Sequence, residues 1–187
     1  ARSASHHRML RSYARHDYIP LAPHLPLPDT GLIVDAGGGV GVLAGLIAEQ
    51  RPGAAVVLLD LPELTAQVPV DSRFVAIGTD LFAPWPVAAD LVLFTRVLHD
   101  WDDDQALALL RHAVEALNPG GQIAILELLL DEHHPGGGLC DLHLRVVTGG
   151  RERSLADFDA LLGRAGLRLV RHERMSSLLN LVLATPQ

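Results

Sequence analysis

The sequence contains no lysine, a single cysteine and few aromatic residues, and these shortages exclude several kinds of chemistry. All 15 basic residues among the 187 are arginines, so no side chain can form a Schiff base or act as a lysine general base. Because Cys140 is the only cysteine, no intrachain disulfide can form, and the cytoplasm is the expected compartment. We expect Cys140 to be a buried apolar side chain rather than a nucleophile.

Long apolar runs and an excess of positive charge are absent as well. The longest uninterrupted apolar run covers residues 54–59, whereas a membrane span needs about 20 residues. The net charge of −7 disfavours sequence-independent binding to a nucleic-acid backbone. With 49% hydrophobic and 20% charged residues, the chain has enough apolar material for one globular domain. We therefore expect neither a membrane nor a nucleic acid as a partner.

From Gly31 onward, short apolar runs alternate with helical patterns, which is typical of an α/β fold. The runs that predict buried strands are residues 32–34, 55–59, 74–77, 91–94 and 123–126, followed by 167–171 and 178–184. The sequence therefore predicts a parallel sheet with helices on both faces.

Helical spacing and breakers divide the rest of the chain. A helix is predicted from Asp102 to the turn at residues 118–121, with Leu117 on its apolar stripe, and another over residues 155–165. Residues 133–138 (HHPGGG) indicate a solvated loop. Residues 1–30 are predicted to hold a helix at 6–18 and a proline-rich connector, separate from the domain at 31–187.

A glycine-rich loop, residues 35–41 (DAGGGVG), follows the first predicted strand and precedes a helix. A dinucleotide fingerprint would require glycine at position 42, which is Val42. Asp35 would repel a pyrophosphate but suits an ammonium or sulfonium group, and Asp60 ends the next strand where a carboxylate can bind ribose hydroxyls. This pattern favours S-adenosylmethionine (SAM) over NAD. The alternative is a tight turn, with a capping aspartate, that binds nothing.

A second candidate site follows the fourth predicted strand. His99 lies at the sheet edge where α/β proteins bind ligands, and its ordinary pKa near about 6.5 suits a general base. Glu127 and Glu152 stand at other strand-end or loop positions and are candidates to orient it. Alternatively, His99 adjoins a helix cap and Glu152 forms a surface ion pair.

A metal site made by His99, Asp100 and His143 is a third hypothesis. Adjacent side chains such as His99 and Asp100 tend to point apart, and ten histidines make chance clusters common. We therefore predict no metal.

Six motifs in series carry a family resemblance. They are residues 35–41 (DAGGGVG), 60–62 (DLP), 80–82 (DLF), 98–103 (LHDWDD), 118–121 (NPGG) and 149–154 (GGRERS). Together they resemble the catalytic domain of the SAM-dependent small-molecule O-methyltransferases, which include caffeate O-methyltransferase and bacterial polyketide-tailoring enzymes. The resemblance implies a Rossmann-like class I methyltransferase sandwich with a mostly parallel seven-stranded sheet.

The resemblance also implies roles for individual residues. His99 is then the base that deprotonates a phenol or enol hydroxyl of a natural-product-type acceptor, flanked by Glu127 and Glu152. Two larger sets follow by resemblance. The cofactor side comprises Asp35, Gly37, Gly39, Asp60, Leu61, Asp80, Leu81 and Arg96, and the acceptor side Asp100, Trp101, His143 and Leu144. The family usually has lysine where this chain has Arg96 and often methionine where it has Leu144.

Family members carry an N-terminal helical dimerisation domain that closes the acceptor pocket, whereas residues 1–30 are too few to form one. We therefore expect a homodimer in the intact form, with that domain lost, cleaved or on another chain. Two alternatives to methylation remain. The bound SAM could support hydroxylation or pericyclic chemistry, or the chain could be a catalytically incomplete SAM-binding or interaction domain.

Overall fold

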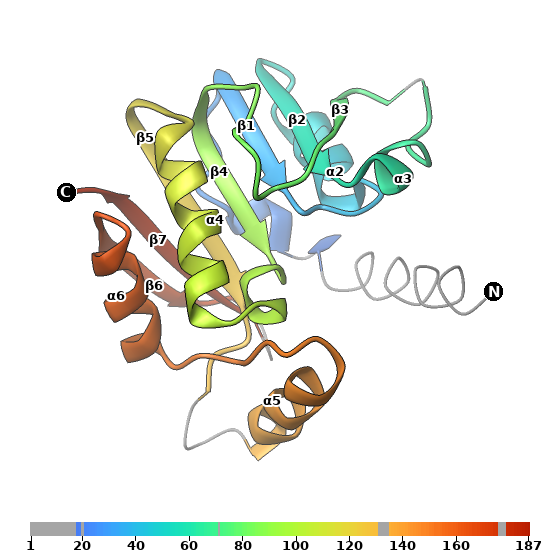
Figure 1. Ribbon diagram of the computed structural model, residues 1–187. Helices are drawn as coiled ribbons and strands as arrows, with labels where there is room; N and C mark the ends of the chain where they lie inside the picture. Colours follow the sequence, from blue (N-terminus) through green and yellow to red (C-terminus); the bar gives the residue numbers. More distant parts are fainter. Residues whose placement is uncertain (1–17, 20, 71, 131–134, 176–178) are drawn as a thin grey trace.

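Seven strands form one sheet in the computed structural model, which describes residues 18, 19, 21–70, 72–130, 135–175 and 179–187 (Figure 1). The strands are β1 (Gly31–Ala36), β2 (Ala54–Asp60), β3 (Val75–Gly78), β4 (Ala89–Thr95), β5 (Leu117–Glu127), β6 (Leu167–Arg174) and β7 (Asn180–Pro186). Their order is β3-β2-β1-β4-β5-β7-β6; β7 pairs antiparallel with both β5 and β6, and the other pairs are parallel. The predicted α/β fold with a mostly parallel seven-stranded sheet is confirmed.

Helices cover both faces of this sheet, so its central strands are apolar on both sides. On one face lie α2 (Val42–Gln50) and the short helix η1 (Ala22–His24); on the other lie α4 (Asp103–Glu115) and α6 (Leu155–Arg164) (Figure 1). Two hydrophobic cores result, one on each side of the sheet. In β4, every residue except Asp90 is buried, which explains the uninterrupted apolar run in the sequence.

Part of the predicted proline-rich connector packs into the hydrophobic core on the α2 side of the sheet. Leu25 and Leu27 are buried there beside Ile47 of α2. The helix expected over residues 6–18 lies outside the described residues, apart from Tyr18. The division of the chain at residue 30 remains a prediction.

The predicted end of α4 was wrong. The helix stops at Glu115, and Leu117, expected on its apolar stripe, begins β5 and pairs with Ala89. Asn118 explains the early start of the strand, because its side-chain amide donates a hydrogen bond to Asp90 Oδ1 at 3.0 Å.

The loop predicted over residues 133–138 was wrong for residues 135–138, which lie in α5 (Pro135–Val147). Residues 133 and 134 lie outside the described residues. Proline fits the first turn of a helix, where its missing N–H has no partner to lose. Cys140 on this helix is half-buried rather than fully buried. Among the described residues, no helix is long and apolar enough to cross a membrane.

Candidate active site

The carboxyl ends of the parallel strands bring the predicted site residues into a row. Because β3, β2, β1, β4 and β5 are consecutive neighbours and run parallel, the residues that follow them meet at one edge of the sheet. In that order the row contains Asp80, Asp60, the glycine loop, His99 and Glu127.

The glycine loop is anchored to the neighbouring strand by Asp60. The N–H of Gly39 donates to Oδ2 of Asp60 at 2.7 Å, and the N–H of Leu61 donates to Oδ1 at 2.7 Å. Gly39 has a φ of 65° and only open space where a Cβ would lie, whereas a Cβ on Gly37 would lie 2.7 Å from Val97 Cγ2. The loop thus touches the segment that carries His99 on one side and is open at Gly39.

Asp35 lies beneath this loop, against Gly38, and is fully buried. Neither of its carboxyl oxygens has a hydrogen-bond partner among the described residues. Burial raises its pKa from 3.8 to about 7, and the charge of Asp60 adds to the rise, while the N–H of Ala44 opposes it. A cation bound above the loop would stabilise the ionised form of this acid.

Three more residues expected on the cofactor side lie toward the outer end of the row, whereas Arg96 faces Glu127 and Glu152. Asp80 is exposed, and its Oδ1 accepts a hydrogen bond from the N–H of Phe82 at 3.0 Å. Leu61 is 44% exposed and Leu81 is half-buried, so both offer apolar surface beside the two aspartates.

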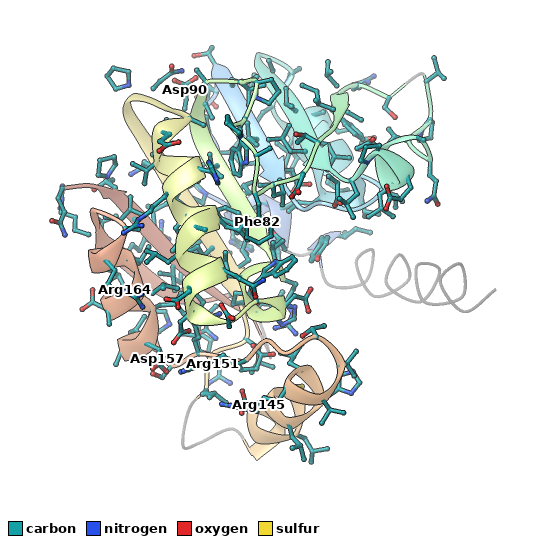
Figure 2. The ribbon with its side chains drawn as sticks, viewed as in Figure 1. Phe82, Asp90, Arg145, Arg151, Asp157 and Arg164 are labelled. Atoms are coloured by element: carbon teal, nitrogen blue, oxygen red, sulfur yellow. The ribbon has the colours of Figure 1, made fainter. Side chains whose placement is uncertain are left out.

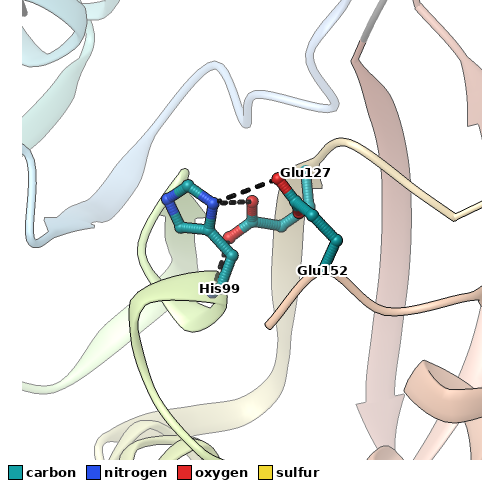
Figure 3. A group of neighbouring side chains, drawn as sticks. All are labelled: His99, Glu127 and Glu152. Atoms are coloured by element: carbon teal, nitrogen blue, oxygen red, sulfur yellow. Dashed lines mark hydrogen bonds and ion pairs between the residues drawn. The ribbon is translucent and has the colours of Figure 1, made fainter. Parts of the chain in front are cut away.

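His99, Glu127 and Glu152 form a buried cluster, as their predicted roles require (Figure 3). His99 belongs to the short helix η2 (Leu98–Asp100). Its Nδ1 lies 3.4 Å from Oε1 of Glu152 and 3.9 Å from Oε2 of Glu127. Two carboxylates facing Nδ1 favour the tautomer with the proton on Nδ1, which leaves the lone pair of Nε2 available as a base.

Glu127 also fixes the backbone that carries the histidine. Its Oε1 accepts hydrogen bonds from the N–H of Val97 at 3.0 Å and of His99 at 3.4 Å. Burial raises the pKa of Glu127, and repulsion from Glu152 adds to the rise, while His99 and Arg96 oppose it.

The electrostatic environment of His99 favours its protonated form. Burial alone would lower its pKa, but the charge of Glu127 and the hydrogen bond to Glu152 outweigh that effect, and the pKa is raised. Arg96 lowers the pKa of His99 and Asp100 raises it. The arrangement makes His99 a stronger base than an isolated histidine.

Arg153 positions this cluster, although its position in the sequence did not by itself mark it as a site residue. It is 1% exposed and donates hydrogen bonds to the carbonyl oxygens of Leu98 at 2.7 Å and Trp101 at 2.9 Å, on either side of His99. Its Nη2 also lies 2.8 Å from Oδ1 of Asp103 in α4. The signal available in the sequence was the arginine next to Glu152, in the motif at residues 149–154.

Backbone hydrogen bonds hold the segment that carries Glu152 in place through the residues before and after it. The N–H of Arg151 donates to the carbonyl of His99 at 2.9 Å, and the N–H of Leu130 donates to the carbonyl of Arg153 at 3.0 Å. The Arg151 guanidinium lies 3.0 Å from Asp157 Oδ1 at the start of α6 (Figure 2). These contacts hold Glu152 next to Glu127 although the two are far apart in sequence.

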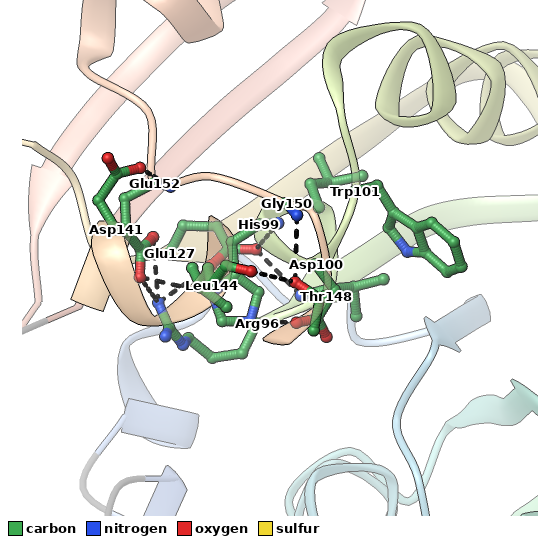
Figure 4. A network of polar contacts seen from close by, with 12 residues as sticks. Arg96, His99, Asp100, Trp101, Glu127, Asp141, Leu144, Thr148, Gly150 and Glu152 are labelled. Carbon is green, nitrogen blue, oxygen red and sulfur yellow. Dashed lines mark hydrogen bonds and ion pairs between the residues drawn. The ribbon is translucent and has the colours of Figure 1, made fainter. Parts of the chain in front are cut away.

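The residues expected on the acceptor side do not all gather at the cluster (Figure 4). Trp101 is half-buried against Phe82, with ring centroids 4.8 Å apart, and Leu144 of α5 is buried. Oδ1 of Asp100 is 3.7 Å from Nε2 of His99, so the expectation that these adjacent side chains point apart was wrong. His143 is exposed.

Among the described residues, the group with the donor types and spacing of a metal site is His99, Glu127 and Glu152, with ligand atoms within 4.8 Å of one another. It is not the set of His99, Asp100 and His143 weighed from the sequence. Nη1 of Arg96 lies 3.1 Å from Glu152 and 3.3 Å from Glu127, so a cation already faces both carboxylates. We assign no metal to this cluster.

Comparison with known proteins agrees with this geometry. The O-methyltransferase domain family matches residues 23–168. The mitomycin biosynthesis 6-O-methyltransferase of Streptomyces lavendulae is 37% identical over 146 residues, which are 74% of this chain and 42% of the relative. The 2,7-dihydroxy-5-methyl-1-naphthoate 7-O-methyltransferase of Streptomyces carzinostaticus is 33% identical over 172 residues, which are 88% of this chain and 52% of the relative.

A solved structure extends the likeness to three dimensions. The O-methyltransferase NcsB1 from neocarzinostatin biosynthesis, in complex with S-adenosyl-L-homocysteine (SAH) and 1,4-dihydroxy-2-naphthoic acid, superposes with a TM-score of 0.89 at 30% identity. The match covers 99% of this chain and 58% of that one. The chain spans about half the length of the curated relatives it matches. Family match, sequence identity and fold agree, and the chain belongs to the O-methyltransferase domain family.

Proposed function

We propose that this chain is the catalytic portion of a SAM-dependent O-methyltransferase that methylates a phenol or enol hydroxyl of a small natural-product-type molecule. The observation that carries the proposal is the cluster of His99 with Glu127 and Glu152, which lies at the same sheet edge as the glycine loop and Asp60. One edge then offers a base for the acceptor and a binding place for the methyl donor.

The residues around the glycine loop fit SAM. The loop is open at Gly39, and the unpaired carboxyl of Asp35 beneath it favours a cationic ligand above. Asp60 stands where a carboxylate would take ribose hydroxyls, with Leu61 and Asp80 further along the row. When bound, SAM would supply an electrophilic methyl group on a sulfonium sulfur, which leaves as a neutral thioether.

His99 would remove the proton from the acceptor hydroxyl. Nε2 takes the proton, the oxygen keeps the electron pair that forms the new O–CH₃ bond, and the imidazolium that results is stabilised by Glu127 and Glu152. Transfer from a phenol of pKa about 10 to a histidine of pKa about 6.5 is uphill by about 5 kcal/mol. The raised pKa of His99 reduces that difference.

The acceptor class rests on the relatives. One relative is a dihydroxynaphthoate O-methyltransferase, and NcsB1 was solved with a dihydroxynaphthoic acid. Because the relatives are about twice as long as this chain, we propose that residues beyond this chain complete the acceptor pocket and pair two copies of the intact protein.

The test separates cofactor binding from proton removal. Calorimetry with SAH is expected to show binding to the parent chain and a loss of at least tenfold in affinity for Asp60→Ala, because the carboxylate at the ribose position is removed. His99→Asn is expected to bind SAH as the parent does. In the intact protein, the same substitution is expected to slow methylation of 1,4-dihydroxy-2-naphthoic acid at least a hundredfold, since general bases contribute about 10²–10⁴-fold.

Asparagine is the informative replacement because its amide retains a donor near the position of Nδ1 and has no atom at Nε2. Arg164→Met, which removes an exposed ion pair with Asp104, is the matched control and is expected to change neither result. No heat with SAH would refute the SAM proposal, and full turnover by His99→Asn would refute the role of His99.

A further inference from the structure

Arg96 has a strained backbone at the end of β4. Its φ is 56°, the one positive φ among the described residues other than glycine, and its N–H still donates to the carbonyl of Leu126 at 3.0 Å. A residue with a Cβ adopts this conformation at an energetic cost, and such strain persists where the surroundings require it. The turn points the guanidinium toward the histidine cluster instead of along the strand (Figure 4).

One nitrogen of Arg96 faces the same carboxylate oxygens as the catalytic histidine. Nη1 lies 3.1 Å from Oε1 of Glu152 and 3.3 Å from Oε2 of Glu127. These are the two oxygens that face Nδ1 of His99, at 3.4 Å and 3.9 Å. Oε1 of Glu152 and Oε2 of Glu127 therefore face both Nη1 of Arg96 and Nδ1 of His99.

Charge explains why the cluster needs this arginine. Glu127 is 1% exposed and Glu152 is fully buried. Two neighbouring carboxylates that are shielded from water do not both stay ionised unless a cation lies beside them. With Arg96 the cluster carries one negative charge while His99 is neutral and none once His99 has taken a proton. Without Arg96, a protonated His99 would be the only cation in the cluster, so the cluster would bind that proton more tightly.

We propose that Arg96 is a positioning residue for the His99 base. The guanidinium of Arg96 is the internal cation that holds Glu127 and Glu152 against Nδ1 of His99. The proposal rests on the proposed function of His99. It differs from the role expected from the sequence, in which Arg96 binds the cofactor.

Other charged groups around the cluster enter any pH dependence. Asp100 lies 3.7 Å from Nε2 of His99. From α5, Asp141 accepts a hydrogen bond from the N–H of Glu152 at 3.0 Å, and Cys140 contributes to the raised pKa of Arg96. These groups stay the same in the variants below, so differences between variants report on Arg96.

The first readout is an NMR titration of the protein without ligands, with the His99 signal identified by its absence from His99→Asn. Arg96→Met is expected to raise the pKa of His99 by about one unit, because it removes a positive charge next to two carboxylates. Arg96→Lys keeps the charge and is expected to stay within a few tenths of the parent. Glu127→Gln is expected to shift the pKa in the opposite direction.

Arg96→Gly is a second neutral variant that accepts the φ of 56° without strain, so it separates charge from backbone and covers a failure of Arg96→Met to fold. It is expected to raise the pKa of His99 as much as Arg96→Met does. The acid limb of the pH profile of kcat/KM should move upward by the same amount. Arg164→Met is the control and should move neither readout.

The outcomes distinguish this proposal from the proposed function. An unchanged His99 pKa in both neutral variants would overturn the role of Arg96. So would a loss of SAH affinity in Arg96→Met with an unchanged pKa, because Arg96 would then be a cofactor ligand. If the parent binds no SAH, the proposed function fails, yet the ligand-free titration still decides whether Arg96 is the internal cation.

Discussion

Asp35 illustrates how one residue can make stability depend on pH. Its carboxyl is fully buried, unpaired among the described residues, and has a pKa raised to about 7. The folded protein therefore binds this proton more tightly than the unfolded chain does. The contribution to stability is complete below about pH 4 and is lost as the pH rises toward 7.

We expect Asp35→Asn to reduce this dependence. The free energy of unfolding of the parent should fall relative to that of the variant between pH 4 and 7, by up to about 4 kcal/mol, since each pKa unit corresponds to about 1.4 kcal/mol. Urea unfolding at several pH values measures the difference. Asp104→Asn, on the exposed side of α4, is the control. A difference between parent and Asp35→Asn that does not change with pH would contradict the assignment.

At the scale of elements, the site depends on how the segment 148–154 docks against η2. Gly150 allows this approach, because a Cβ there would overlap the carbonyl oxygen of His99 and the backbone of Asp100. Arg153 then reaches the carbonyls of Leu98 and Trp101. The histidine cluster is thus assembled by backbone contact between two segments some fifty residues apart.

Two glycine substitutions should have opposite effects. Gly150→Ala is expected to destabilise the fold by about 1–3 kcal/mol through the forced backbone shift, and to lower turnover by moving Glu152 from His99. Gly163→Ala, in α6 with nothing within 4 Å of its Cβ position, is expected to stabilise by about 0.5–1 kcal/mol. Thermal unfolding and the rate with 1,4-dihydroxy-2-naphthoic acid measure both effects. Equal stability of the two variants would show that segment 148–154 tolerates the shift.

The molecule as a whole leaves an apolar helix face in contact with solvent. On α5, Leu139, Leu142, Val146 and Val147 are 76%, 63%, 78% and 60% exposed. The helix lies at the end of the sheet that carries the histidine cluster (Figure 1). Exposed apolar surface of this kind favours association.

We expect the chain to self-associate with increasing concentration, and the double variant Leu142→Gln, Val146→Gln to do so less, with no loss of thermal stability because both side chains are exposed. Sedimentation velocity over a hundredfold concentration range measures this. Val70→Gln, at a fully exposed loop position, is the control. If the parent stays monomeric over the whole concentration range, the exposed face of α5 does not mediate self-association.

The local pattern of the sequence was sufficient for the sheet and for placing His99 and Glu127 at one of its edges. Strands buried on both faces require unbroken apolar runs, and the residues that follow parallel strands share an edge, so His99 and Glu127 could be placed there. Local pattern failed where long-range contacts decide. The side chain of Asn118 donates a hydrogen bond to Asp90, and the adjacent Leu117 pairs with Ala89 as the first residue of β5. The glycines at the start of α5 indicated a loop but lie in a helix.

The sequence by itself thus indicated the family and placed His99 and the glycine loop after neighbouring strands, since these depend on spacing along one chain. Only the tertiary structure decided which groups surround His99. Arg96 turns toward Glu127 and Glu152 because of a backbone conformation that no periodicity encodes. Arg153 is buried between two segments that meet only in the fold. Electrostatic energies depend on distances and burial, and these become defined when the chain packs.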